Sequence, residues 1–255
     1  MIRMETVLLC EPTPEGIFTG VYAAYEQKLN PNTTHIRLGE SENYQLFTEY
    51  RRVEASQEKA AKVERTVRKR FGSYTAESLW YAMASCHPDR GDAVYHTIAR
   101  GMAGAYRGEL MDYLQDSYVN LTAKLRQSVW SEAHKLTGFV RFAELESGLM
   151  YSEIEPKNDV LTFLGEHFGD RFPGENFIIR DKGRKLYLVH RAGQEYFLVW
   201  DKGEYYRLTY SPGEESVQEL FRCFVHSISI KERENKKLQR QMLPLRFRPN
   251  MIDFK

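Results

Sequence analysis

The sequence has few cysteines and no long hydrophobic run. Its three cysteines, Cys10, Cys86 and Cys223, lie far apart and form no CxxC pair. That spacing argues against a disulfide framework and against an iron–sulfur cluster. The first residues contain only a short apolar run, Val7 to Cys10, before an acidic stretch with prolines, which is typical of neither a signal peptide nor a membrane span. We therefore expect a cytoplasmic protein that has no membrane partner.

The common cofactor motifs are also missing. The sequence contains no GxxxxGK[ST] phosphate loop, no GxGxxG after a strand, and no HExxH or His-x-His pair. The nearest approach to a nuclease metal site is Glu155-Pro156-Lys157 beside Asp159, but a proline there marks the end of a strand. We therefore expect no cofactor and no bound metal.

The chain also lacks an overall charge, because its formal net charge is only +1 over 255 residues. The charge is unevenly distributed, however. Residues 51–71 contain eight Lys or Arg against three Glu, and residues 231–248 contain seven against two, so the remainder of the chain is acidic. Two basic segments in an acidic protein fit a localised contact with phosphates, although exposed helix faces produce such runs without any partner.

Hydrophobic periodicity predicts an α+β protein with a helical N-terminal half followed by a small antiparallel sheet with packed helices. Strands are expected at 6–10 and 35–38. The predicted helices of this half are 17–29, 54–71 (ended by Gly72), 76–85, 93–106 and 121–136. A soft domain boundary near 120 would separate a mostly helical region, 1–120, from an α+β domain, 121–255, and the chain could equally form a single domain.

The second half alternates between strand and turn patterns. Strands are expected at 139–145, 149–154, 177–180, 186–190 and 196–200, with glycines at the turns. Asn158 is expected to cap a helix over 160–168. Near the end, apolar residues at helical spacing predict a buried stripe made of Val217, Leu220, Phe221, Phe224, Val225 and Ile228.

Two groups of residues could carry chemistry. The first contains histidines in a segment rich in Arg, Asp and Glu, where His134 or His167 could transfer protons together with Glu144 or Glu155. Each histidine, taken alone, is more often a packed or surface residue. The second group, in the basic tail, could neutralise the phosphates of a nucleic acid: Lys231, Arg233, Lys236, Lys237 and Arg240. Alternatively, these basic residues could belong to a terminal helix in which they form exposed ion pairs with acidic neighbours.

The same segments resemble a family assigned to DNA metabolism, whose domain is of unknown function. The resemblance is carried by EAHKLTGFVRF (132–142), Glu153 to Pro156, HFGDRF (167–172), FIIRDKGR (177–184) and IKERENKKLQRQMLP (230–244). The opening PTPEGIFTGVYAAYE is similar to that of the family as well. Members are encoded beside radical-SAM proteins thought to act on DNA, and a similar domain occurs fused to uracil-DNA glycosylases.

The resemblance implies a DNA metabolism or repair accessory protein that binds DNA and works with a radical-SAM partner. If the motifs converge, Arg141, Arg171, Asp181 and Arg184 would line a pocket. Two alternatives stay open at this point. One is a DNA-processing enzyme with His/Glu acid–base chemistry, and the other is a protein–protein adaptor without affinity for DNA.

Overall fold

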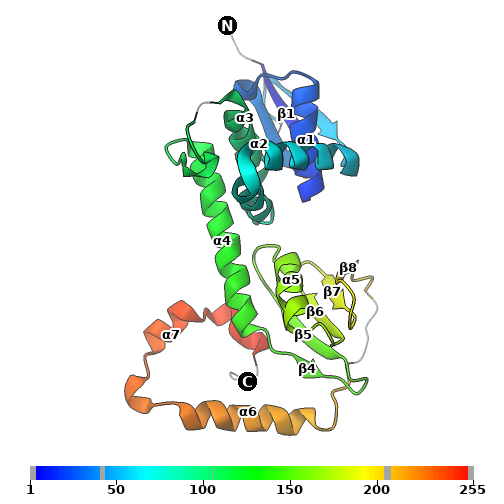
Figure 1. Cartoon of the computed structure of the whole chain (residues 1–255), viewed down its shortest axis with the longest axis vertical. Coiled ribbons are helices and arrows are strands. Elements are labelled where there is room, and N and C mark those ends of the chain that lie inside the picture. Colours follow the sequence, from blue (N-terminus) through cyan, green and yellow to red (C-terminus); the bar gives the residue numbers. More distant parts are fainter. Residues whose placement is uncertain (1–3, 41–43, 105, 204–207, 252–255) are drawn as a thin grey trace. The chain divides into compact units, whose positions relative to one another are not determined.

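The computed structural model describes residues 4–40, 44–104, 106–203 and 208–251 (Figure 1). The chain forms two compact units, Met1–Ser131 and Glu132–Lys255. Their boundary falls inside the long helix α4 (Ser117–Phe139), eleven residues after the expected position near 120. Both units combine helices with a small sheet, which confirms the α+β class.

The first unit is built on a three-stranded parallel sheet. Strand β1 (Glu5–Cys10) lies at the centre, between β2 (Thr34–Leu38) and β3 (Thr48–Val53). Helix α1 (Pro14–Glu26) makes the crossover from β1 to β2, and a short 3-10 turn, η1 (Pro31–Thr33), precedes β2. The N-terminus of α1 is fixed by Thr13, whose side chain accepts a hydrogen bond from the Gly16 N–H.

The remaining elements of this unit are α2 (Gln57–Met83), α3 (Arg90–Ala103), η2 (Leu110–Asp112) and the first part of α4. As expected, Gly72 ends the first helical segment of α2: its φ of 87° is not helical and favours glycine. The second segment follows directly after this kink. The core between the sheet and the helices includes Leu8, Ile17, Phe18, Ile36, Leu79 and Tyr95.

The second unit contains a five-stranded sheet in the order β4 (Ala143–Glu144), β5 (Met150–Ile154), β6 (Phe177–Asp181), β7 (Leu186–His190) and β8 (Phe197–Trp200). The expected antiparallel sheet is only partly correct, because β5 and β6 pair in parallel. The cause is α5 (Leu161–Arg171), which lies between them in the chain and carries it back over the sheet.

Helix α5 covers one face of this sheet. A Cβ added at Gly165 would lie only 2.6 Å from the Leu188 side chain, so glycine permits the close approach of helix and strand. Phe168 makes an edge-to-face contact with Phe177 on β6. Asn158 does not cap α5, because the residue at the cap position is Val160; the amide of Asn158 donates instead to Glu132.

The C-terminal elements are α6 (Glu214–Ile228), η3 (Lys231–Arg233), α7 (Lys236–Met242) and η4 (Leu245–Asn250). The prediction of a buried stripe on α6 was wrong, since the side chains of Val217, Leu220, Phe224 and Ile228 are all more than half exposed. The helical period marks an apolar face but does not tell what covers it.

Among the described residues, no helix is both long and apolar enough to cross a membrane.

Candidate functional site

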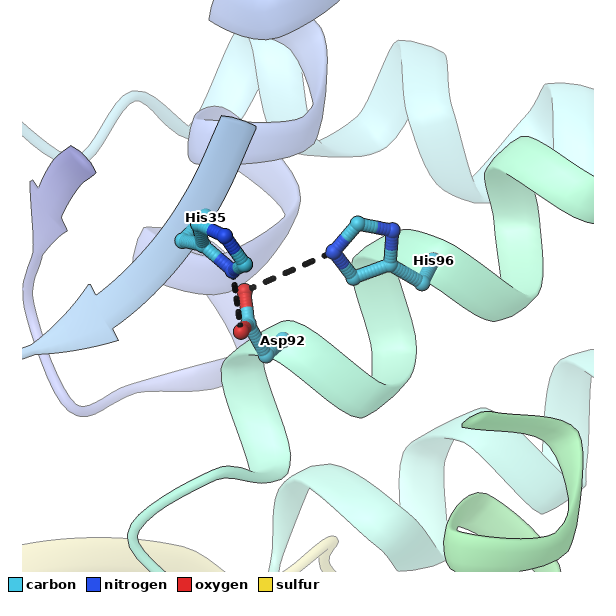
Figure 2. Close-up of side chains that lie close together, drawn as sticks. All are labelled: His35, Asp92 and His96. Carbon is cyan, nitrogen blue, oxygen red and sulfur yellow. Dashed lines mark hydrogen bonds and ion pairs between the residues drawn. The ribbon is translucent and has the colours of Figure 1, made fainter. Parts of the chain in front are cut away.

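Two histidines and an aspartate meet in the first unit (Figure 2). His35 comes from β2, whereas Asp92 and His96 lie one turn apart at the start of α3. Nδ1 of His35 is 2.7 Å from Oδ2 of Asp92, and Nε2 of His96 is 3.9 Å from Oδ1 of the same carboxylate. One potential ligand atom from each residue lies within 4.8 Å of the others, so the three side chains could hold a metal ion.

The close approach of β2 and α3 explains why these residues meet. A Cβ added at Gly91 would lie 3.0 Å from both the carbonyl oxygen and Cγ2 of Ile36, so only glycine fits there without a shift of its neighbours. The next residue, Asp92, accepts a hydrogen bond from the Ile36 N–H through Oδ1, at 2.7 Å. Its place in the first turn of α3 also suits a negative charge.

The two histidines have different surroundings. The hydrogen bond with Asp92 raises the pKa of His35 above its ordinary value, and the side chain of His35 is 27% exposed. Burial lowers the pKa of His96, which stacks on Tyr118 with ring centroids 4.0 Å apart. Within the described parts of the chain, Nε2 of His96 is buried and has no hydrogen-bond partner. The cluster therefore presents a partly exposed histidine, a carboxylate and a buried ring nitrogen.

Motif reasoning missed this cluster because its members are far apart in the sequence. His35 precedes Asp92 by 57 residues. A local signal was present, since Asp92 and His96 are four residues apart and therefore share a helix face. Nothing in a single sequence, however, tells which strand that face would meet.

A second feature is a pocket of about 740 Å³ in the second unit, on the sheet face opposite α5. Its lining includes Tyr151 and Tyr187, whose side chains share this face with Arg180, and Trp200, which pairs with Leu186 in the register of β7 and β8 and so directs its side chain to the other face. Arg180 donates to Asp201 at 3.0 Å and to Glu153 at 3.3 Å, and its guanidinium lies 5.5 Å from the centroid of the Tyr187 ring. The pocket thus combines aromatic surface with a cation whose charge is locally balanced.

The residues predicted as catalytic lie in four separate segments. His134 is exposed on α4, and His167 is half-buried on α5, where its ring contacts Phe168 edge to face. Glu144 is exposed on β4 and accepts a hydrogen bond from the Ser211 hydroxyl at 3.0 Å. Glu155 is exposed just after β5. Their catalytic role stays a prediction.

Of the four residues predicted to line a pocket, two contact each other. Nη1 of Arg184 lies 2.9 Å from Oδ2 of the fully buried Asp181. Arg184 also donates to the carbonyl oxygens of Pro156 and Lys157, so the pair anchors the loop after β5. Arg141 donates to the carbonyl oxygens of Gly138 and Val140, and the exposed Arg171 lies over Phe172.

The same loop is held from its other side by Glu132, which opens the EAHKLTGF motif. This buried carboxylate accepts hydrogen bonds from the backbone N–H groups of Lys157 and Asn158, and it forms an ion pair with Arg246 at 2.7 Å. Part of the sequence motif on which the family resemblance depends therefore serves to fix a loop.

Four of the five residues predicted to contact phosphates are exposed: Arg233, Lys236, Lys237 and Arg240. The side chain of Lys231 lies outside the described residues. Lys236 is 3.8 Å from Glu234, and both of these side chains are largely exposed, so the pair contributes little stability. These cations are available for an external anion.

The fold and these features define an α+β protein with a polar cluster in its N-terminal unit and a sheet pocket in its C-terminal unit. A family model described as "Domain of unknown function (DUF4130)" matches residues 88–253. The match covers well over half of the chain, and the chain therefore belongs to this family. It includes Asp92, His96 and all but the last two residues of the second unit, but not His35. No curated protein matches the chain.

Proposed function

We propose that this protein is a DNA metabolism accessory protein that binds nucleic acid through its second unit. The observation that carries the proposal is the pocket on the open face of the five-stranded sheet. Aromatic side chains on an open sheet face can stack with unpaired bases, and such stacking tolerates any sequence. Tyr151 and Tyr187 supply aromatic surface in this pocket.

The polar groups of the pocket favour a base over a phosphate. Arg180 is held between Glu153 and Asp201, so its charge is balanced, while its N–H groups stay oriented by those contacts. Tyr187 donates its hydroxyl to Asp201 at 3.2 Å, which fixes the ring. A neutral, planar ligand with hydrogen-bonding edges suits this lining better than an anion does.

Phosphate contact would come from the exposed cations Arg233, Lys236, Lys237 and Arg240. The basic residues of α2 are a poorer candidate, because half of them already have acidic partners. Lys62 lies 2.6 Å from Glu58, Arg68 lies 3.2 Å from Glu64, and Lys59 lies 3.0 Å from Glu26. The two basic segments have similar composition, but only the C-terminal one leaves most of its charge for a polyanion.

A radical-SAM protein is the partner that we propose, on the strength of the family resemblance. The exposed stripe of α6 gives a specific reason to consider a second function, that of an adaptor. An amphipathic helix that is followed by exposed cations fits an apolar groove with an acidic rim on a partner protein. In that case, Val217, Leu220 and Phe224 would contact the radical-SAM protein.

The test is fluorescence-anisotropy binding of the full chain to single-stranded DNA over a series of salt concentrations. Three variants separate the contributions: Tyr187→Ala, a triple Lys236/Lys237/Arg240→Ala variant, and a matched triple Lys59/Lys62/Arg68→Ala variant on α2. We expect Tyr187→Ala to weaken binding by about 5- to 100-fold, as loss of one stacked base would. The α7 triple variant should lower the slope of log K against log salt by about 2 to 3.

The α2 triple variant should bind like the unaltered protein, because its cations are already paired. Equal losses in the α2 and α7 variants would contradict the assignment of the phosphate contact. Absence of binding at low salt would contradict the nucleic-acid proposal as a whole, and would favour the adaptor function. The adaptor function is then tested by measuring complex formation between this chain and the radical-SAM protein. The double substitution Leu220→Asp and Phe224→Asp should abolish that complex.

A further inference from the structure

We propose that His35, Asp92 and His96 bind one divalent transition-metal ion of the zinc class. The proposal concerns the first unit and does not depend on nucleic-acid binding by the second. Two imidazoles and a carboxylate are a common ligand set for such ions, and a site with three protein ligands keeps coordination positions open for water or for an oxygen atom of a substrate.

The spacing of the three side chains fits a metal ion. Tetrahedral ligands at Zn–N distances of about 2.0–2.1 Å are themselves about 3.3 Å apart. The observed separations, 2.7 Å from Nδ1 of His35 to Oδ2 of Asp92 and 3.9 Å from Oδ1 of Asp92 to Nε2 of His96, lie on either side of that value and involve both carboxylate oxygens. One ligand atom from each residue lies within 4.8 Å of the other two. Rotation of these side chains would have to close the widest of these separations toward about 3.3 Å for all three atoms to share a coordination sphere.

The strongest reason is the buried nitrogen of His96. Its side chain is only 6% exposed, and Figure 2 shows the ring with one nitrogen facing Asp92. At 3.9 Å that nitrogen is too far away for a hydrogen bond, and over the described ranges nothing else pairs with it. Buried polar atoms are nearly always satisfied, so this one calls for an explanation. An ion between the imidazole and the carboxylate would provide it.

The carboxylate is already oriented as a metal ligand would be. The Ile36 N–H donates to Oδ1 of Asp92 and so fixes the plane of the carboxylate, as outer-shell donors do in metal sites. Stacking on Tyr118 fixes the ring of His96. A purely structural link between β2 and α3 would need only Asp92 with His35 and Ile36. It would leave the buried Nε2 of His96 without a hydrogen bond among the described residues.

The site also has a suitable charge and access. With neutral imidazoles it carries the single negative charge of Asp92, and the nearby Arg100 is paired with Asp116 at 3.0 Å. The side chains of His35 and Asp92 are 27% and 20% exposed, so an ion can enter from that side, and water can reach the open coordination positions.

The test uses the full chain, stripped of metal with a chelator, and titrates it with Co²⁺ and Zn²⁺. Co²⁺ reports coordination through its visible absorption, and Zn²⁺ through a rise of the thermal midpoint with concentration, since an ion that binds only the folded state stabilises it. The key variant is His96→Phe, which keeps a ring for stacking on Tyr118 and removes the buried nitrogen. The matched control is His87→Asn, which breaks an exposed histidine–carboxylate pair with Asp89 at 4.0 Å.

We expect one Co²⁺ per chain with the absorption of a four- or five-coordinate site. His96→Phe should lower the affinity more than about 100-fold, because loss of an outer-shell partner alone costs about 10- to 100-fold. Its metal-free form should melt no lower than the unaltered chain, which excludes misfolding as the cause. His87→Asn should bind as before. Absence of Co²⁺ absorption in the unaltered chain, or a loss of affinity in His87→Asn but not in His96→Phe, would overturn the proposal.

Discussion

Asp181 in the second unit and Asp92 in the first both join a strand to a neighbouring segment, but their polar neighbours differ. Asp181 is fully buried and accepts from Arg184, whose other N–H groups reach two backbone carbonyl oxygens. Asp92 accepts from Ile36 and His35, while the ring nitrogen of His96, 3.9 Å from the same carboxylate, has no hydrogen-bond partner within the described chain. The first network is closed and holds a loop. The second is open, at a partly exposed position where a ligand could complete it.

If this comparison is correct, residues of the closed network should matter most for stability. The largest effect is expected for Glu132→Ala, in the contacts that hold the same loop. It removes the acceptor of the part-buried N–H of Lys157, of the buried N–H of Asn158 and of Arg246. We expect the free energy of unfolding to fall by about 3 kcal/mol, the lower end of the cost of breaking a buried ion pair, because the side chain of Arg246 is 35% exposed and solvent screens it. Urea unfolding followed by circular dichroism measures it.

Glu155→Ala serves as the control, because Glu155 is an exposed carboxylate beside the same loop. Its effect should stay within about 0.5 kcal/mol. Similar losses in both variants would show that the buried contacts of Glu132 do not determine the stability of the loop.

The next largest loss of stability is expected for Arg184→Leu, which removes the cation beside the buried carboxylate of Asp181. The backbone N–H of residue 184 still donates to that carboxylate. We expect the free energy of unfolding to fall by about 2–3 kcal/mol, because the buried carboxylate loses a charged hydrogen-bond partner. Adding Asp181→Asn should recover part of that loss, because the unpaired charge is then gone. If the loss of stability in the double variant equals the sum of the losses in the two single variants, Arg184 and Asp181 are not coupled.

Strand patterns predicted the second unit more successfully than the first. The alternation in Phe177–Asp181 and Leu186–His190 reflects one face packed against α5, so the pattern and the fold agree. Strand β3, TEYRRV, was missed because it carries three charged residues and no residue in it is fully buried. The break predicted at Gly72 is also found, because glycine can adopt a φ of 87° and so lets the chain change direction between two helical segments.

The candidate sites were harder to predict than the fold, for a physical reason. Local periodicity tells which face of an element is apolar, but a site depends on which elements meet. His35 and His96 come together only because β2 and α3 pack closely, and Tyr187 and Arg180 line a pocket only because one face of the sheet is left open by α5. The exposed stripe of α6 illustrates the same limit, since its pattern is indistinguishable from that of a buried helix.

The smallest effect on stability is expected in the open network, where Gly91→Ala tests the approach of α3 to β2. The added Cβ would lie 3.0 Å from the carbonyl oxygen of Ile36. Because that atom belongs to the main chain of β2, the contact can be relieved only if the start of α3 moves away. We expect a loss of about 1–3 kcal/mol, typical of overpacking, together with weaker Co²⁺ binding because Asp92 moves relative to His35. Gly169→Ala is the matched control, since its Cβ would find its nearest neighbour, His190, at 3.8 Å, an ordinary contact. That substitution should be neutral or stabilising, because alanine favours helix over glycine. If Gly91→Ala were equally harmless in both stability and Co²⁺ affinity, the close approach of strand and helix would not be what positions Asp92.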